Sequence, residues 1–421
     1  MKIFKFGGAS INSEDRIRNT GNIIKSYSGE KILIVVSAMG KTTNTLEEVV
    51  HSFINNEKSV ALSKFENIKQ SHLQTLTNLV GAQAEDATSY LESFFTEIEW
   101  LLHDNPVRGN DYYYDQIVCS GELMSSRIVA QYLQNESINA CWIDVRDIIR
   151  TDDTFRDATI DWRFTEKRIY ESVIPLFDIH DVIVTQGFIG STDQNESTTL
   201  GREGSDYSAA IFANITNAES VTIWKDVDAV MSADPKKYAN ASIIKELSYT
   251  EVIEMAYYGA QVIHPKTIKP LQNKNIPLLV KSFIDPSLPG TIISNNTSKQ
   301  LPPIIVNKEN QVLITFQTKD FSFVEDKPAE QLQELFRAVK VKPNLSQRTA
   351  ISLLCCFDDH PEKIQQLALQ AGGLFDVHVE KALTLLTIRH FQENILESLI
   401  NGRTVILEQK TTETVQMLMR D

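Results

Sequence analysis

A lysine and two adjacent glycines near the start of the chain are the residues best suited to chemistry with phosphate. Lys5 lies in residues 3–6, a short run whose apolar alternation is typical of a strand. Gly7 and Gly8 follow it, and a backbone without Cβ atoms can turn sharply and bring its N–H groups close to an anion. An ordinary strand-to-helix turn is the alternative interpretation of the same residues.

A second polar segment, SAMGKTTN at residues 37–44, follows another strand-like run. Its Gly-Lys-Thr invites comparison with a P-loop, but that motif requires a glycine five residues before the second one, where this chain has Val35. We therefore reject a P-loop. Ser37 and Thr43 remain candidates for binding a substrate, and a polar loop that caps a helix is the alternative.

Glu122 is a candidate for binding a positively charged group. It lies among small residues in a helical pattern, SGELMSS at residues 120–126. A carboxylate there can pair with the ammonium group of a substrate, whereas a solvated glutamate on a helix surface is the alternative interpretation.

A fourth segment, GREGSDYSAA at residues 201–210, is a glycine-framed loop that leads into a predicted helix. Ser205 and Asp206 fall in the first turn, and the N-terminus of a helix attracts anions. Arg202 can hold a carboxylate through two parallel hydrogen bonds. Asp206 suits either helix capping or the orientation of a lysine.

A fifth segment places carboxylates, lysines and an aromatic side chain after one strand-like run. Its candidates for ligand binding are Trp224, Lys225, Asp226, Asp234 and Lys236. Such a loop can hold a nucleotide together with its Mg²⁺, and a charged surface loop is the alternative.

The elements that must position these groups alternate between strand and helix patterns over the first 285 residues. Short β-branched runs predict strands at residues 31–36, 181–185, 221–224 and 276–281. Helical patterns lie at about residues 13–26, 43–55, 115–136, 164–175, 205–214 and 249–258. This order predicts an α/β fold in which helices sandwich a mainly parallel sheet, with a ligand crevice at the carboxyl ends of the strands.

Two regions depart from this alternation. Residues 60–110 have a helical period with an apolar stripe, which predicts an inserted helical layer. Beyond a linker that starts at Pro286, the strand and helix units shorten. Strands are predicted there at residues 312–317, 350–357, 374–380, 383–389 and 404–409, and helices at 328–339, 361–371 and 392–400. This is an α+β pattern of one βαββαβ set and part of another.

Composition is typical of a globular protein, with 42% hydrophobic and 23% charged residues among 421. The net charge of −14 argues against general affinity for nucleic acid, so an anionic ligand needs a local basic pocket. The four cysteines form no CxxC pair and lie near no histidine at zinc-ligand spacing, so no metal site built from protein ligands is expected. With no signal-like start and no run of eighteen apolar residues, a cytoplasmic location without membrane contact is expected.

Taken in order, these segments resemble the motifs of the aspartate kinases, which belong to the amino-acid kinase family. The family's Lys-Phe-Gly-Gly-Thr-Ser is matched at residues 5–10, its Gly-Glu-Leu-Met-Ser at 121–125 and its Gly-Arg-Gly-Gly-Ser-Asp at 201–206. Residues 224–236 resemble Trp-(Thr/Lys)-Asp-Val-Asp-Gly…Asp-Pro-Arg, and residues 258–265 resemble a segment ending in Gly-Ala-Lys-Val-Leu-His-Pro. The chain departs from these motifs at Ala9, Glu203, Ala229, Lys236 and Gln261.

The resemblance implies an amino-acid kinase catalytic domain at residues 1–295. It also implies an ACT-like regulatory and dimerisation region at 303–421, with one full module and a partial or intertwined second. The implied reaction is ATP-dependent phosphorylation of the side-chain carboxylate of L-aspartate, the first step of lysine, threonine and methionine biosynthesis. ATP and Mg²⁺ are the implied cofactors, with Mg²⁺ held mainly by phosphate oxygens and water. A homodimer or higher homo-oligomer is expected.

The resemblance also implies roles for single residues. Lys5 and the amides of Gly7 and Gly8 stabilise the transferring phosphoryl group, and Asp206 holds Lys5 in place. Groups implied in aspartate binding are Ser37, Thr43, Glu122, Arg202 and Ser205. Groups implied in ATP binding are Lys5, Gly8, Trp224, Lys225, Asp226, Asp234, Lys236 and Gln261, with Lys281 at the edge of the site.

Two other functions remain open. The first is another kinase of the same fold, acting on glutamate, acetylglutamate, carbamate or a nucleotide. The second is a non-catalytic amino-acid-binding subunit, which the departures at Glu203 and Gln261 favour. Residues 320–327 are acidic and polar where an effector loop is expected, so we predict weak or unusual regulation by lysine and threonine.

Overall fold

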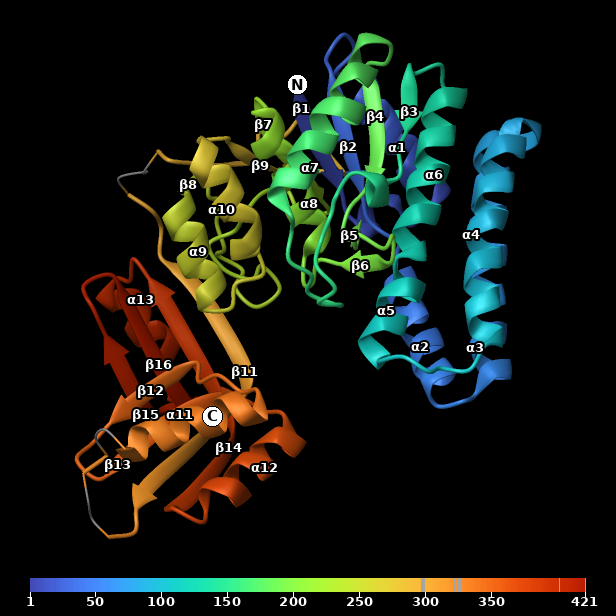
Figure 1. Ribbon diagram of the computed structural model, residues 1–421. Helices are drawn as coiled ribbons and strands as arrows, with labels where there is room; N and C mark the ends of the chain where they lie inside the picture. The colour runs from blue at the N-terminus through green and yellow to red at the C-terminus, as the bar shows by residue number, and fades with distance from the viewer. Residues whose placement is uncertain (297–299, 321–322, 325–326, 401, 421) are drawn as a thin grey trace. The chain divides into compact units, whose positions relative to one another are not determined.

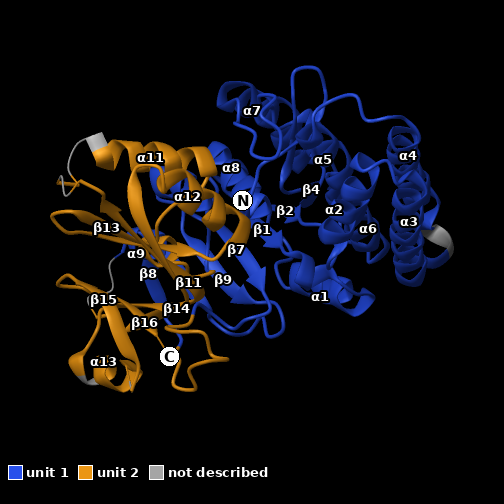
Figure 2. Cartoon of the chain, turned by 90° about the horizontal axis from the view of Figure 1, so that it is seen from below, with its two compact units in different colours: residues 1–230, 243–253, 262–298 blue, residues 231–242, 254–261, 299–421 orange. Residues whose placement is uncertain are grey.

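The computed structural model describes residues 1–296, 300–320, 323–324, 327–400 and 402–420 (Figure 1). The chain divides into two compact units, which Figure 2 distinguishes by colour. The first unit comprises residues 1–230, 243–253 and 262–298, and the second comprises residues 231–242, 254–261 and 299–421. Two short segments from within the predicted catalytic domain therefore group with the C-terminal region, and the chain passes between the units more than once.

An eight-stranded sheet forms the centre of the first unit, in the order β3-β4-β2-β1-β7-β9-β10-β8. Its strands are β1 (Lys2–Phe6), β2 (Ile32–Val36), β3 (Ala140–Trp142), β4 (Val182–Gln186), β7 (Ser220–Lys225), β8 (Glu246–Ser248), β9 (Leu278–Ser282) and β10 (Thr291–Ser294). Neighbouring strands are parallel except β9 and β10, which pair antiparallel. The predicted α/β fold with a mainly parallel sheet is confirmed.

Helices pack against this sheet (Figure 1). α8 (Gly204–Thr216) contacts β1, β2 and β7, and α6 (Ser120–Asn135) contacts β2, β3 and β4. The other helices of this unit are α1 (Glu14–Lys25), α2 (Thr42–Ile54), α3 (Lys58–Val80), α4 (Glu85–His103), α5 (Asn110–Val118), α7 (Trp162–Arg168) and α10 (Pro265–Lys274). α3 and α4 occupy the predicted helical insertion, and α9 (Tyr249–Tyr257) divides between the two units.

The strand register brings the polar segments together. β2 and β4 are buried along their whole length, which agrees with the apolar run Ile-Leu-Ile-Val-Val of β2 and the Val-Ile-Val that begins β4. Phe6, at the end of β1, pairs with Val36 at the end of β2 and with Trp224 in β7. The segments that follow these three strands therefore start at the same edge of the sheet.

Two predicted helices are interrupted in the structure. The helix predicted at residues 115–136 is split into α5 and α6, which meet at Cys119. The helix predicted at residues 164–175 leaves the α form after Arg168 and continues as a π turn and a 3₁₀ turn. Pro175 accounts for this second break, because its ring excludes the α-helical hydrogen bond at that position.

The second unit contains a six-stranded antiparallel sheet in the order β12-β13-β11-β14-β16-β15. Its strands are β11 (Ile304–Thr318), β12 (Leu345–Arg348), β13 (Ser352–Asp358), β14 (Phe375–Arg389), β15 (Thr404–Lys410) and β16 (Thr414–Arg420). Its helices are α11 (Lys327–Val339), α12 (Pro361–Ala371) and α13 (Glu393–Ile400).

The predicted C-terminal α+β region is confirmed, although its strands are longer than expected. The separate strands predicted at residues 374–380 and 383–389 are one strand, β14, which passes Ala382 at a positive φ of 58°. One half of β11 and of β14 completes a βαββαβ set with α11, β12, β13 and α12. The other halves pair with each other, and β14 continues the sheet to β16 and β15. The two halves of this sheet thus share the long strands β11 and β14, and the division of the region into ACT-like modules stays a prediction.

Candidate active site

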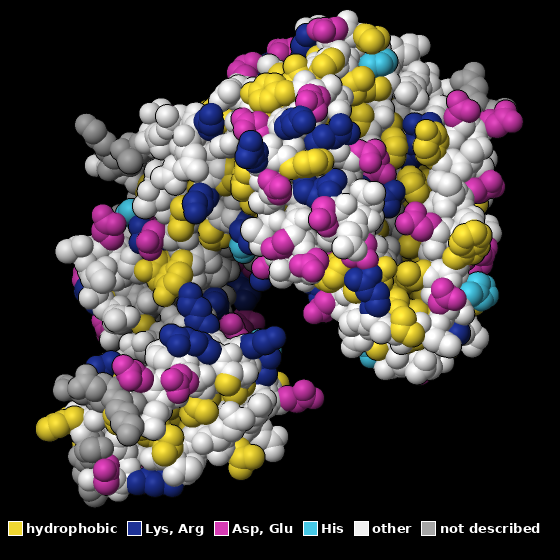
Figure 3. Space-filling view, viewed as in Figure 1, with side chains coloured by type: hydrophobic (Ala, Val, Ile, Leu, Met, Phe, Trp, Pro, Cys, Tyr) yellow, Lys and Arg dark blue, Asp and Glu magenta, His cyan; other side chains and the backbone are white. Residues whose placement is uncertain are grey.

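The polar segments of the first unit surround a pocket of about 550 Å³. It is lined by Lys5, Gly8, Ser37, Ala38, Gly40, Thr43, Tyr114, Glu122, Arg156, Phe188, Gly201, Arg202, Glu203, Gly204, Ser205, Asp206 and Lys225. Residues from all five predicted segments meet here, and the fifth segment contributes Lys225 alone. Basic and acidic side chains are interspersed on the face of the molecule shown in Figure 3. The pocket itself gathers four cationic side chains, Lys5, Arg156, Arg202 and Lys225.

Lys5 and Asp206 form an ion pair inside the pocket. The Lys5 Nζ atom lies 2.7 Å from Asp206 Oδ1, and the two side chains are 12% and 4% exposed. β1 carries the lysine, and the first turn of α8 carries the aspartate. Because removing two charges from water costs about as much as their attraction returns, such a pair adds little to stability, and its position in a pocket favours a functional role.

Gly8 allows the loop after β1 to pack closely against the loop after β2. A Cβ atom at residue 8 would lie 2.6 Å from the carbonyl oxygen of Ala38 and 3.0 Å from that of Gly40. The Gly40 amide also donates a 3.0 Å hydrogen bond to the Gly8 carbonyl. Gly7 lies beside the lysine, since a Cβ atom there would be 3.4 Å from Lys5 Nζ. A residue with a side chain would therefore separate the two loops at residue 8.

Glu122 is buried in α6 and only 3% exposed, so it is not the solvated helix glutamate that the sequence left open. Its Oε1 atom accepts a 3.1 Å hydrogen bond from the Ala38 amide. Its Oε2 atom is buried without a hydrogen-bond partner among the described residues. Burial raises the pKa of Glu122 to about 8, although the Ala38 hydrogen bond and the positive charge of Lys5 oppose that rise. A buried oxygen without a partner at a pocket wall can accept a hydrogen bond from a cationic ligand.

The loop before α8 supplies Arg202 and Glu203 to the pocket. Arg202 is exposed, whereas Ser205 and Asp206 are buried in the first turn of the helix. Glu203 adopts a left-handed conformation with φ of 54°, which suits the glycine that the family motif has there. Its Oε2 atom accepts a 2.9 Å hydrogen bond from the His264 amide. Glu203 therefore has a structural contact of its own at the pocket wall.

Trp224 does not offer its ring to a nucleotide. The side chain is 1% exposed and packs between Phe4 and Phe6, with ring centroids 5.7 Å and 6.1 Å away. Its predicted role in ATP binding is therefore corrected: the ring belongs to the core, because β7 is a central strand. Lys225, the next residue, does line the pocket and donates a 2.6 Å hydrogen bond to the Val262 carbonyl.

Apart from Lys5, Gly8 and Lys225, the residues predicted to bind ATP are not among those that line the pocket. Asp226 is exposed at the end of β7. Lys281 Nζ lies 5.6 Å from the Trp224 ring centroid. Asp234, Lys236 and Gln261 belong to the second unit. Their part in an ATP site stays a prediction.

Three lining residues lie outside the five predicted segments, namely Tyr114, Arg156 and Phe188. The guanidinium carbon of Arg156 lies 4.0 Å from the centre of the Tyr114 ring. Arg156 and Phe188 both have a φ of 69°, a backbone conformation that residues other than glycine rarely adopt. Arg156 stands in the charged run TDDTFRD and Phe188 in the GFIG segment directly after β4, but neither belongs to the five segments that the sequence singled out.

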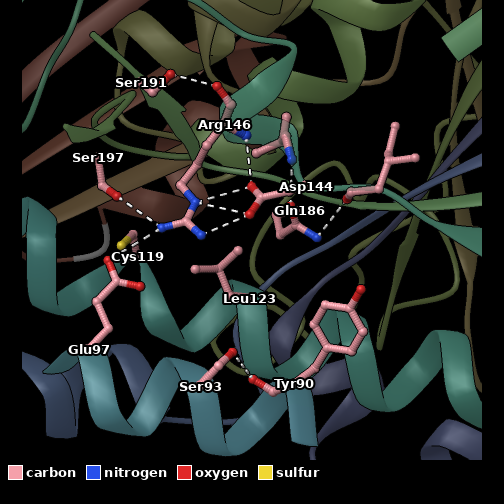
Figure 4. A network of polar contacts seen from close by, with 12 residues as sticks. Tyr90, Ser93, Glu97, Cys119, Leu123, Asp144, Arg146, Gln186, Ser191 and Ser197 are labelled. Atoms are coloured by element: carbon pink, nitrogen blue, oxygen red, sulfur yellow. Dashed lines mark hydrogen bonds and ion pairs between the residues drawn. The ribbon is translucent and has the colours of Figure 1, made fainter. Parts of the chain in front are cut away.

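A polar network holds the short hairpin of β5 (Ile189–Ser191) and β6 (Ser197–Thr199), which precedes the Arg202 loop (Figure 4). Arg146 makes hydrogen bonds to both carboxylate oxygens of Asp144, and it donates a 3.5 Å hydrogen bond to Ser197 Oγ. The Ser191 hydroxyl donates a 2.5 Å hydrogen bond to the Arg146 carbonyl. Both strands of the hairpin are therefore anchored to this arginine.

Neither a metal cluster nor a membrane-spanning helix is found in the part of the chain that the structure describes. No three histidine, cysteine, aspartate or glutamate residues gather there as metal ligands would. No described helix combines the length and the apolar character needed to cross a membrane.

Residues 1–282 match the amino acid kinase family, and the chain belongs to that family. Its relatives carry the name aspartokinase. The lysine-sensitive aspartokinase 3 of Escherichia coli is 29% identical over 398 residues, which are 92% of this chain and 86% of that protein. The crystal structure of E. coli aspartokinase III in complex with aspartate and ADP matches with a TM-score of 0.82 and 26% identity, covering 100% of this chain and 96% of that one.

Other relatives are much longer than this chain. The bifunctional aspartokinase/homoserine dehydrogenase 2 of Arabidopsis thaliana is 35% identical over 297 residues, which are 69% of this chain and 32% of the plant protein. The chain thus spans about a third of the length of such bifunctional relatives. The resemblance to aspartate kinases that the motifs predicted is confirmed at the level of family and fold.

Proposed function

We propose that this protein is an ATP-dependent aspartate kinase that makes 4-phospho-L-aspartate. One observation carries the proposal: a single pocket contains the Lys5–Asp206 ion pair together with Glu122 and Arg202. The pair suits a transferring phosphoryl group, and the other two side chains offer opposite charges to the two charged groups of an α-amino acid. The aspartate and ADP bound by E. coli aspartokinase III in its crystal structure support this choice of substrates.

In the proposed reaction an oxygen of the substrate's side-chain carboxylate attacks the γ-phosphorus of ATP. The bond from that phosphorus to the β–γ bridging oxygen breaks, and ADP leaves. Since the carboxylate is already a nucleophile, the site needs no strong general base. Catalysis then depends on positioning and on stabilisation of charge, which Lys5 and the amides of Gly7 and Gly8 supply. Asp206 keeps the Lys5 ammonium group oriented.

The amino acid is held at both ends. Arg202 pairs with the α-carboxylate of aspartate, and the unpaired Oε2 of Glu122 accepts from its ammonium group. Ser37, Thr43 and Ser205 line the remaining wall and supply hydroxyl groups.

Lys225 contributes to the ATP site from the pocket wall, and Asp226, Asp234, Lys236 and Gln261 are proposed as its further residues. Mg²⁺ would be held by the phosphate oxygens of ATP and by water. A homo-oligomer formed through the ACT-like region and a cytoplasmic location remain predictions of the same proposal.

A coupled assay of ADP release with a panel of acceptors tests this function. L-Aspartate should support turnover, whereas glutamate, acetylglutamate, carbamate and UMP should not. Turnover with one of these four and not with aspartate would assign the protein to another branch of the family. No ATP turnover with any acceptor, combined with saturable binding of aspartate, would favour the non-catalytic subunit.

A further inference from the structure

Asp115 is a buried carboxylate that none of the roles above uses. It lies in α5 and is 0% exposed. Its Oδ2 atom accepts hydrogen bonds from the amides of Arg156 and Thr199, at 2.9 Å and 2.7 Å. Its Oδ1 atom accepts a 2.8 Å hydrogen bond from the Thr199 hydroxyl. One side chain thus holds two segments that are more than forty residues apart in sequence.

The next residue of α5 extends this attachment. The Gln116 side-chain amide donates a 2.8 Å hydrogen bond to the Ser197 carbonyl, and its Oε1 atom accepts a 3.1 Å hydrogen bond from the Ser197 amide. Two consecutive side chains of α5 therefore bind the backbone of β6, in the manner of a neighbouring strand. β6 has three residues and forms a two-stranded sheet with β5. The side chains of α5 and the Ala158 amide bind its other edge.

Both segments held by Asp115 lead directly into the pocket. Arg156 lines the pocket itself, and its conformation is the uncommon left-handed one. Thr199 ends β6, three residues before Arg202, and Gly201 and Arg202 also line the pocket. The Ala158 amide also donates a 2.9 Å hydrogen bond to the Thr199 carbonyl, so Asp115 and this backbone contact together hold the two arginine-bearing segments behind the pocket wall.

We propose that Asp115 is a positioning residue for the acidic substrate: its three hydrogen bonds fix the Arg156 and Arg202 segments at the spacing that binds a dicarboxylic amino acid. The inference rests on the proposed function, because it assigns the substrate's carboxylates to these arginines. Asp115 itself touches no substrate. A negative charge is not required of it, since an asparagine could accept both amides at its oxygen and donate from its nitrogen to the Thr199 hydroxyl.

Steady-state kinetics of three variants test this role. Asp115→Ala should raise KM for aspartate at least tenfold and leave KM for ATP within twofold. The KM values of Asp115→Asn for aspartate and for ATP should both stay within about threefold of the wild-type values, because asparagine keeps the hydrogen bonds. Thr199→Val, which removes the hydroxyl alone, should give a KM for aspartate between those of the wild type and Asp115→Ala. This variant keeps the proposal testable if Asp115→Ala does not fold.

Leu102→Ala is the matched control. Leu102 is 0% exposed in α4 and does not line the pocket, so its truncation lowers stability without moving either arginine segment. Equal increases of both KM values in Asp115→Ala, an unchanged KM for aspartate in Thr199→Val, or the same rise in Leu102→Ala would overturn the proposal.

Hydrogen exchange separates this proposal from the proposed function. The amides of Arg156 and Thr199 should exchange at least tenfold faster in Asp115→Ala than in the wild type, and at wild-type rates in Asp115→Asn and Leu102→Ala. If the wild-type protein fails to phosphorylate aspartate while these exchange rates hold, the function is wrong and the attachment by Asp115 stands. Unchanged exchange at both amides in Asp115→Ala would overturn the attachment itself.

Discussion

Several single residues in the pocket are suited to binding a charged ligand and contribute little to the stability of the fold. Burial disfavours the ionised form of Glu122, and its Oε2 atom has no partner among the described residues. Lys5 is held at 2.7 Å from Asp206 in a wall that excludes most solvent. Such groups cost stability where they stand, and a charged ligand would offset that cost.

The first prediction at this scale concerns Lys5. Lys5→Ala should lower kcat by about a hundredfold or more, because a preorganised positive charge beside the transferring phosphoryl group is lost. Turnover is measured in the coupled ADP assay, and circular dichroism checks that the fold is intact. Turnover close to that of the wild type would remove Lys5 from the mechanism.

The second prediction concerns Arg202. Arg202→Ala should raise KM for aspartate strongly and leave KM for ATP nearly unchanged, because the arginine is assigned to the α-carboxylate. Initial rates over both substrate concentrations give the two constants. An equal rise in both would place Arg202 in the nucleotide site or in the folding of its loop.

The third prediction concerns pH. With a pKa of about 8, Glu122 is protonated in the empty pocket at neutral pH and must lose its proton to pair with the substrate ammonium. KM for aspartate should therefore fall as pH rises from 6 to 8, by up to about tenfold per unit, and level off above 8. Glu122→Gln should bind aspartate weakly at every pH and lose this dependence. A pH profile that the glutamine variant retains would assign the titration to another group.

At the scale of elements, two close approaches shape the site: the loops after β1 and β2 at Gly8, and α5 on β6 at Asp115. The first of these gives the fourth prediction. Gly8→Ala should destabilise the protein by about 1–3 kcal/mol, because the new methyl group would meet two carbonyl oxygens of the neighbouring loop. Thermal unfolding measures the change.

Gly109→Ala is the control for that substitution. Its added methyl group would have nothing within 4 Å, and its φ of −64° is open to any residue. It should leave the unfolding midpoint nearly unchanged. Equal midpoints for the two variants would show that the loops after β1 and β2 do not require the glycine.

The sequence predicted helices and strands well where an apolar run bounded by polar residues marked the element. The buried strands β2 and β4 and the helix α8 were found because their apolar runs and polar ends stand out. β16 was missed although Thr414–Arg420 contains the apolar run Met-Leu-Met, and β3, β5, β6 and β8 were too short to show a period.

The motifs predicted most of the polar residues that line the pocket. The residues that the motifs missed or misassigned depend on tertiary contacts. Lys5, Glu122 and Arg202 line the predicted pocket. The burial of the Trp224 ring follows from the central position of β7 in the sheet order, which one chain read by itself does not reveal. Asp115 and Arg156 gain their importance only from contacts with segments distant in sequence.

At the scale of the whole molecule, the second unit is not a separable tail. Its core of residues 299–421 contacts segments 231–242 and 254–261, through the Ile305 amide to the Ser232 carbonyl at 2.7 Å and through Arg389 to Glu254 at 3.4 Å. Deleting the C-terminal region would leave these segments without their partners. Loss of activity on such a deletion would therefore say nothing about regulation.

The fifth prediction concerns that regulation. Lysine and threonine, each at millimolar concentration, should change activity less than about twofold, equivalent to about 0.4 kcal/mol of coupling. The reason is the acidic segment 320–327 in place of an effector loop, of which residues 321–322 and 325–326 lie outside the described structure. Assays at subsaturating aspartate measure the effect. Strong inhibition by either amino acid would contradict this prediction.

The most direct test of the account is the chemical identity of its product. The protein is incubated with ATP, Mg²⁺ and L-aspartate, and hydroxylamine is added to trap any acyl phosphate as a hydroxamate for mass spectrometry. The account predicts aspartate β-hydroxamate in an amount equal to the ADP released, and none with the Lys5→Ala variant. Release of ADP without this hydroxamate, or a hydroxamate formed on the α-carboxylate, would contradict the assignment of the pocket.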